Sequence, residues 1–79
     1  MRVIIRFSVD GEKNSVLRNK LVKSLTDVGF VRGKKTATFE HSTISAGNLG
    51  VALQDFYRLA QTHKGPGTLD HFWLYSDQT

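Results

Sequence analysis

Asp10 is the residue whose position best suits chemistry, because its carboxylate follows an alternating segment and precedes Gly11. Loops that a rigid sheet holds in place are the usual location of functional side chains. A hard divalent ion such as Mg²⁺ often takes only one or two protein carboxylates and completes its shell with water and phosphate oxygens. Two copies of Asp10 on the axis of a two-fold dimer would form such a site. The alternative is that Asp10 simply makes an Asx turn with Gly11.

Few other residues have a spacing that indicates catalysis. The three histidines, His41, His63 and His71, lack the spacing of a metal-binding motif, and the chain has no cysteine. It contains neither a glycine-rich phosphate loop nor a nucleophile-elbow motif. A thiolate metal site is therefore excluded, and serine-nucleophile chemistry has no support.

Basic residues are concentrated in the first half of the chain. The net charge is +4; residues 1–35 hold nine Lys/Arg against three Asp/Glu, whereas residues 36–79 hold two against four. Such asymmetry is typical of a surface that contacts phosphates. The candidate phosphate contacts are Arg2, Arg6, Arg18, Lys20, Lys34 and Lys35. The alternatives are a solvated basic helix face and, for the two strand arginines, pairing with carboxylates of neighbouring strands or of a dimer mate.

These candidates need a scaffold, and the N-terminal segment predicts a strand. Residues 2–9 alternate between a purely apolar side and a mixed side that carries Arg2, Ile4 and Arg6. The apolar side is expected to face helices and the mixed side to lie on an open sheet face. Two arginines on an open face suit a phosphate backbone.

An amphipathic helix and a hairpin are expected next. Asn14 or Ser15 would cap a helix that runs to about Val28, and Gly29 would end it. Residues 30–41 then predict a short strand at 30–32, a two-residue turn at positions 33 and 34, and a longer strand at about 35–41. The alternative is a bulge at Gly33 in one continuous strand, which would leave a three-stranded βαβαβ unit.

The second half predicts another helix and a final strand. Ser45 is the candidate N-cap of a helix at about 46–63. The final strand, at about 69–75, has Phe72 and Leu74 on one side and Leu69, His71, Trp73 and Tyr75 on the other. If the first side faces the helices, the aromatic side chains lie on the open face. There they would stack on bases or form a dimer interface, and the interface is the preferred interpretation.

This element order predicts one α+β domain over residues 1–79. The expected fold is a ferredoxin-like βαββαβ arrangement, a four-stranded antiparallel sheet with two helices on one face. A chain this small leaves much of its surface exposed, so dimerisation would stabilise it. The chain has no apolar run of about 18 residues and no signal-peptide pattern at its start. We therefore expect a cytoplasmic homodimer that does not contact a membrane.

Several segments together resemble a known family. They are residues 3–7 leading to Asp10, Arg18 and Lys20 in the basic helix, residues 38–40 followed by Ile44 and Ser45, and Asp70 with Leu74 and Tyr75. In this order the chain resembles the small CRISPR adaptation subunit and its relative, virulence-associated protein D. The resemblance implies a ferredoxin-like dimer with metal-dependent nuclease or toxin-like ribonuclease activity. It also implies that Asp10, the strand-end aspartate, is the metal ligand on the dimer axis.

Two functions are therefore expected. In the first, the six basic residues contact phosphates of DNA or RNA, while Asp10 of both subunits holds a Mg²⁺ ion that polarises a scissile phosphate. In the second, the chain is a small regulatory or inhibitory module that docks on another protein through its open sheet face or a strand edge. Salt separates the two, because phosphate binding weakens steeply as salt rises and an aromatic protein interface barely responds.

Overall fold

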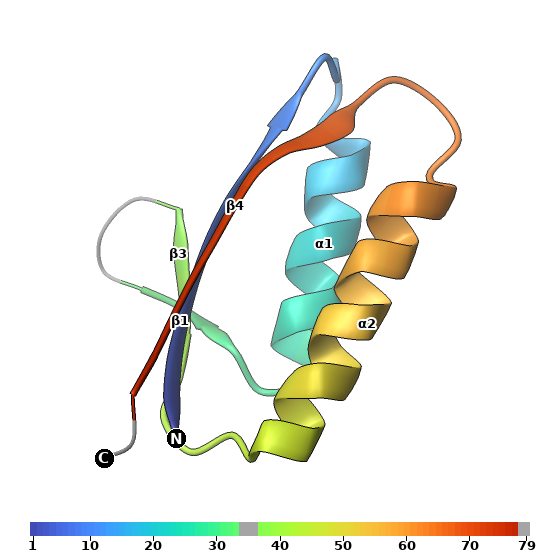
Figure 1. The fold of residues 1–79 in the computed structure, drawn as a ribbon. Helices are drawn as coiled ribbons and strands as arrows, with labels where there is room; N and C mark the ends of the chain where they lie inside the picture. Colours follow the sequence, from blue (N-terminus) through green and yellow to red (C-terminus); the bar gives the residue numbers. More distant parts are fainter. Residues whose placement is uncertain (34–36, 78–79) are drawn as a thin grey trace.

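The expected order of elements is present. The structure, a computed structural model, describes residues 1–33 and 37–77. Its elements are β1 (Arg2–Asp10), α1 (Val16–Asp27), β2 (Val31–Arg32), β3 (Thr38–His41), α2 (Ala46–Thr62) and β4 (Thr68–Asp77). The two helices lie side by side on one face of the sheet, and its other face is uncovered (Figure 1).

The four strands form one antiparallel sheet in the order β2-β3-β1-β4. β1 is central and pairs with both β3 and β4, whereas β2 and β4 are the edges. The prediction of an α+β fold with four antiparallel strands and two helices is confirmed. Within the described residues 1–33 and 37–77, no helix is long and apolar enough to span a membrane.

The segment after α1 is a hairpin. Val31 pairs with Glu40 and Arg32 with Phe39, and the Gly33 N–H donates to the Thr38 carbonyl at 2.8 Å. The alternative of one continuous strand is therefore wrong. β3 begins at Thr38, and its expected start at about residue 35 lies outside the described residues, as does part of the expected turn at positions 33 and 34.

The core fills the space between β1 and the helices. Val3, Ile5 and Phe7 on the inward side of β1 are buried, as the alternating pattern predicts. The helices contribute Leu17, Leu21 and Leu25 from α1 and Leu49, Ala52 and Phe56 from α2. The Phe56 ring is fully buried and lies 5.1 Å from the Phe7 ring and 5.2 Å from the Phe72 ring, measured between centroids. Phe56 is therefore the aromatic centre of the core.

A register shift in β4 changes which of its residues face the helices. Ser8 pairs with His71 but Val9 pairs with Leu69, so Asp70 is an extra residue on β4. A residue inserted in this way reverses the side to which the following positions point. Leu69 therefore packs against the core instead of lying on the open face with His71, and that prediction is wrong.

The N-terminus of α1 is capped by a residue that the sequence pattern did not indicate. Ser15 occupies the N-cap position, but it has a left-handed backbone (φ 56°) and makes no side-chain cap. Instead, Oε2 of Glu12 accepts hydrogen bonds from the backbone N–H groups of Leu17 at 3.0 Å and Arg18 at 3.3 Å. The carboxylate satisfies two of the free N–H groups of the first turn and lies at the positive end of the helix dipole.

Replacing Glu12 by alanine is expected to destabilise the domain by about 1 kcal/mol, the usual effect of losing a helix cap. Glu12→Gln keeps an oxygen acceptor without the charge and is expected to lose less stability than Glu12→Ala. The measurement is the urea midpoint of unfolding followed by circular dichroism. An unchanged midpoint for Glu12→Ala would show that the carboxylate does not stabilise α1.

The other helix ends follow the sequence more closely. Gly29 has φ +100° and its N–H donates to the Thr26 carbonyl, while the Phe30 N–H donates to the Leu25 carbonyl. These two bonds form a Schellman stop, as expected for a glycine here. Ser45 caps α2 as predicted, its hydroxyl accepting from the Asn48 N–H at 3.1 Å.

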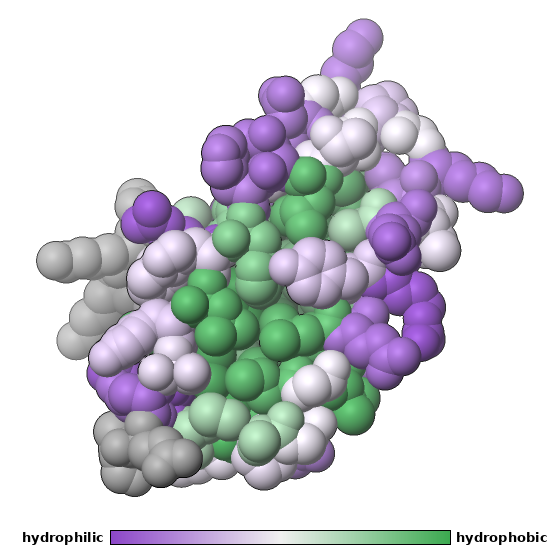
Figure 2. Space-filling model, in the orientation of Figure 1, coloured by the Kyte–Doolittle hydropathy of each residue, from purple (hydrophilic) through white to green (hydrophobic). Residues whose placement is uncertain are grey.

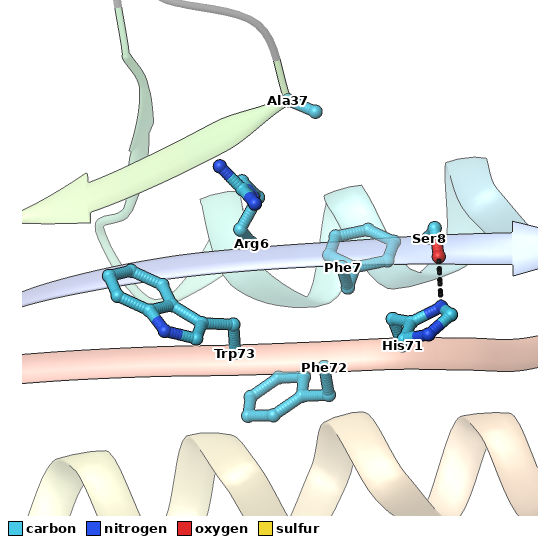
Figure 3. Close-up of a pocket in the computed structure, with 7 residues that line it drawn as sticks. All are labelled: Arg6, Phe7, Ser8, Ala37, His71, Phe72 and Trp73. Atoms are coloured by element: carbon cyan, nitrogen blue, oxygen red, sulfur yellow. Dashed lines mark hydrogen bonds between the residues drawn. The ribbon is translucent and has the colours of Figure 1, made fainter.

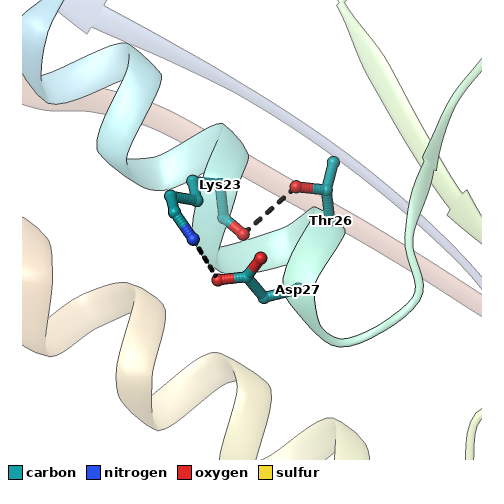
Figure 4. Close-up of polar contacts among 3 residues, drawn as sticks. All are labelled: Lys23, Thr26 and Asp27. Atoms are coloured by element: carbon teal, nitrogen blue, oxygen red, sulfur yellow. Dashed lines mark hydrogen bonds and ion pairs between the residues drawn. The ribbon is translucent and has the colours of Figure 1, made fainter.

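The last turn of α1 contains a local polar cluster. Lys23 Nζ lies 2.8 Å from Asp27 Oδ2, and the Thr26 hydroxyl donates to the Lys23 carbonyl (Figure 4). The lysine offsets a carboxylate that is otherwise unfavourable at the negative end of the helix dipole.

Candidate nucleic-acid interface

The uncovered face of the sheet carries a group of side chains from the two adjacent strands β1 and β4. We call this group, Arg6, Ser8, His71, Trp73 and Tyr75, the open-face platform. The register places Arg6 opposite Trp73 and Ser8 opposite His71, while Tyr75 lies opposite Ile4. Opposite residues of antiparallel strands point to the same face, so the platform follows from the alternation of the two strands.

Two exposed aromatic rings dominate the platform. Trp73 is 52% exposed and Tyr75 40%, and their ring centroids are 6.3 Å apart. The Arg6 guanidinium lies 6.0 Å from the centroid of the Trp73 ring, within the range of a cation–π contact. A cation beside two accessible rings can bind a planar ring that is linked to an anion.

A hollow of about 570 Å³ lies beside Arg6, Trp73 and His71 of the platform (Figure 3). Its lining residues are Arg6, Phe7, Ser8, Ala37, His71, Phe72 and Trp73. It is open to one side, and the Arg6 and Trp73 side chains lie next to each other along its wall (Figure 3). The volume falls within the range typical of ligand sites, about 300–1,000 Å³.

His71 contacts both Ser8 and Asp70, but the three residues do not form a catalytic triad. His71 Nδ1 lies 2.6 Å from Asp70 Oδ2. The same nitrogen lies 3.5 Å from Ser8 Oγ (Figure 3). In a triad the acid and the serine use different ring nitrogens, so that one nitrogen donates and the other accepts. Here both contacts fall on the same nitrogen, and the contact with Asp70 is much the shorter. The arrangement orients the imidazole and does not activate the serine.

Arg2 lies on the same sheet face, but its charge is already balanced. One guanidinium nitrogen lies 3.8 Å from Glu40 Oε1 and the other 3.7 Å from Asp77 Oδ2. Arg2 therefore pairs with carboxylates of the neighbouring strands, which is the alternative that the sequence left open for the strand arginines. For Arg6, no carboxylate of the described residues lies within ion-pair distance. Arg6 is the arginine of this face that is available to an external anion.

The helix candidates are not part of the platform. The Arg18 guanidinium lies 5.7 Å from the ring of Phe7, which faces the helices, and Lys20 Nζ donates to His63 Nδ1 at 3.4 Å. Both side chains therefore belong to the helical layer. Lys34 and Lys35 lie outside the described residues.

Asp10 lies exposed at the end of β1, opposite Thr68 on β4. Its nearest acidic neighbour along the chain, Glu12, is engaged at the N-terminus of α1. Among residues 1–33 and 37–77, no group of three or more His, Asp or Glu side chains is suitably placed to hold a metal ion. Asp10 therefore has no ready-made cluster of ligands around it in the described residues, and Asp10 as a metal ligand remains a prediction that depends on a second copy.

Two contacts of this region were not expected from the sequence. The contact of Ser8 with His71 follows from the register of β1 and β4, and that of Asp70 from the bulge that makes Asp70 an extra residue, neither of which a local sequence pattern indicates. The aromatic residues and Arg6 were found because simple alternation places them on the open face.

Comparison of the chain with protein-family models, with curated proteins and with solved structures found no match. The class of site therefore follows from its geometry alone: an exposed aromatic and cationic surface on an antiparallel sheet.

Proposed function

We propose that the chain is a ferredoxin-like domain that binds single-stranded nucleic acid on its open-face platform. The ferredoxin-like assignment is supported by the βαββαβ order and by two helices on one face of a four-stranded antiparallel sheet. The observation that carries the proposed function is the exposed Trp73 and Tyr75 pair beside an arginine without a carboxylate partner.

Each part of the platform has a defined role in this proposal. Trp73 and Tyr75 stack on bases, which are accessible only where a strand is unpaired. Arg6 contacts a phosphate or stacks on a base. The hollow beside Arg6 receives a further part of the nucleotide. Binding of this kind tolerates many sequences, because every base has a π face.

Phosphate contacts by Arg18, Lys20, Lys34 and Lys35 remain predictions. Arg18 and Lys20 are on the helical layer, so a strand bound on the platform would have to pass around the sheet to reach them. The proposal therefore assigns the main electrostatic contribution to Arg6.

Arg6→Gln tests the electrostatic part of the proposal. The logarithm of the binding constant falls with the logarithm of salt concentration, with a slope of about −0.7 per phosphate contact for single strands. We expect Arg6→Gln to bind a labelled oligonucleotide more weakly and to reduce the magnitude of that slope by about 0.7.

Arg58→Gln is the matched control, because it removes the same charge from the exposed surface of α2. Its salt slope is expected to equal that of the unmodified chain. Equal salt slopes for both variants would mean that Arg6 does not contact a phosphate. A binding constant that does not change with salt concentration would favour a protein-binding module.

Nuclease activity requires separate evidence. We expect cleavage, if the resemblance extends to it, to need added Mg²⁺ and to be lost in Asp10→Ala while affinity for the oligonucleotide is retained. Gel analysis of labelled DNA and RNA with and without Mg²⁺ measures this. Cleavage that persists in Asp10→Ala would remove Asp10 from the chemistry.

A further inference from the structure

The second interaction surface of the molecule is the free edge of β4. This strand is the longest in the sheet, with 10 residues, and among residues 1–33 and 37–77 it pairs only with β1. An edge strand presents unpaired N–H and C=O groups, and proteins usually shorten, charge or cover such edges. No lysine, arginine or proline protects β4. Its edge is therefore suited to pairing with another strand.

An apolar strip lies beside this edge. Figure 2 shows hydrophobic side chains gathered in a continuous strip where β4 runs past α2 (compare Figure 1). Leu53 and Ala60 of α2 and Phe72 and Leu74 of β4 are only partly buried, although they pack against the core. The strip is core surface that this chain alone leaves incompletely covered.

The flank of α2 that borders the strip carries no charge. The Tyr57 ring lies 5.2 Å from the Phe72 ring, so this side of the helix faces β4. Gly50, Leu53 and Ala60 fall on the same side by helical periodicity. A Cβ on Gly50 would meet no atom of the described residues within 4 Å, so none of these neighbours requires glycine at this exposed position. A glycine in a helix is unfavourable, and it permits a close approach from outside.

The regular part of β4 is complementary to itself. Between the bulge at Asp70 and the end of the strand lie residues 71–77, with Leu74 at their centre. If two copies pair antiparallel over this whole segment, a two-fold axis passes through Leu74. Each His71 is then opposite Asp77 of the other copy, and each Trp73 is opposite Tyr75.

Other registers are less favourable. A shift of the pairing by one residue would set the helix-facing side chains of one copy beside the open-face side chains of the other copy. A shift of the axis to Trp73 extends the pairing into the bulge and sets the apolar Leu69 opposite Asp77. The register centred on Leu74 sets the His71 imidazole opposite the Asp77 carboxylate and Trp73 opposite Tyr75, and aromatic cross-strand pairs stabilise sheets.

Asp77 gives an independent reason for this register. Its Oδ1 atom is buried and has no hydrogen-bond partner in the part of the chain that the structure describes. A buried acceptor of this kind is normally satisfied. In this register the His71 side chain of a second copy, which is 82% exposed in the single chain, lies opposite Asp77 on the same sheet face.

We propose that a second copy of this chain covers the β4 edge and that the two sheets join into one of eight strands about an axis at Leu74. This inference does not depend on nucleic-acid binding. It leaves the open face free, and it brings the Trp73 and Tyr75 rings of both copies into one continuous surface. Asp10 pairs with Thr68, six residues from Leu74, so each copy lies about 20 Å from the axis. This dimer therefore does not bring the two Asp10 carboxylates together.

Cysteine cross-linking tests the register directly, because the chain has no cysteine of its own. Opposite residues of antiparallel strands have Cα atoms about 4.5–5.5 Å apart, which a disulfide can span. In the variant carrying both His71→Cys and Asp77→Cys, the two new thiols of one chain are about 20 Å apart and cannot join. We expect this double variant to form a covalent dimer under mild oxidation.

The single variants His71→Cys and Asp77→Cys are the controls. In the proposed register, identical positions of the two copies lie far apart, so each single variant is expected to remain monomeric on a non-reducing gel. A covalent dimer from either single variant, or none from the folded double variant, would overturn the proposed register.

Sedimentation equilibrium gives the second measurement without relying on cysteine. The unmodified chain is expected to reach twice its 8.9 kDa mass. His71→Lys places a cation opposite Asp77 and is expected to dimerise, whereas His71→Asp sets two carboxylates together and is expected to raise the dissociation constant about tenfold. A monomeric unmodified chain at high concentration would overturn the dimer and leave the nucleic-acid proposal intact.

Discussion

Replacing Phe56 by alanine is expected to reduce the free energy of unfolding by about 3–5 kcal/mol, the usual loss for a buried phenylalanine. A domain of this size has a free energy of unfolding of about 4–12 kcal/mol, so the variant is expected to lose a large fraction of its stability. The measurement is urea unfolding followed by circular dichroism.

The reason lies in the position of the Phe56 ring. It is fully buried and contacts Phe7 on β1 and Phe72 on β4, so it joins the second helix to two strands. Its neighbour Tyr57 is 42% exposed and makes the matched control. We expect Tyr57→Ala to reduce the free energy of unfolding clearly less than Phe56→Ala does. Equal losses for the two variants would contradict a core centred on Phe56.

Replacing Trp73 by alanine is expected to weaken binding of a single-stranded oligonucleotide by about 5- to 150-fold. Loss of one base–aromatic stack reduces the binding free energy by about 1–3 kcal/mol, and each 1.4 kcal/mol changes the dissociation constant about tenfold. The variant also removes the surface against which Arg6 lies. Fluorescence anisotropy of a labelled oligonucleotide measures the affinity.

Trp73→Phe is the control for this prediction, because it keeps an aromatic face at the same position. Its affinity is expected to lie between those of the unmodified chain and Trp73→Ala. Because Trp73 is half exposed, neither change is expected to unfold the domain. If Trp73→Ala bound as tightly as the unmodified chain, bases would not stack on this residue.

Periodicity predicted the parts of the molecule that depend on one segment at a time. The alternation in residues 2–9 correctly separated the buried Val3 and Ile5 from Arg2 and Arg6, and Ser45 correctly marked the start of α2. These features depend on which side of a strand or helix meets the core, and the sequence carries that pattern directly.

Features that depend on strand register, on an unusual backbone conformation or on side-chain pairing were not predicted. The bulge at Asp70 moved Leu69 to the helix side, because the register of β4 is set by its pairing with β1. The cap from Glu12 requires a backbone path through a left-handed Ser15, which no local preference indicates. Net charge showed how many basic residues the chain has but not which of them a neighbouring carboxylate balances, as Glu40 does for Arg2.

The most direct test of nucleic-acid binding uses the fluorescence of Trp73, since it is the single tryptophan of the chain and lies on the platform. The protein would be titrated with short single-stranded DNA and RNA at low and at moderate salt, with the matching duplexes as controls. We expect saturable quenching by single strands that weakens as salt rises, and much less quenching by duplexes. Unchanged tryptophan fluorescence with every single strand at low salt would contradict the proposed function.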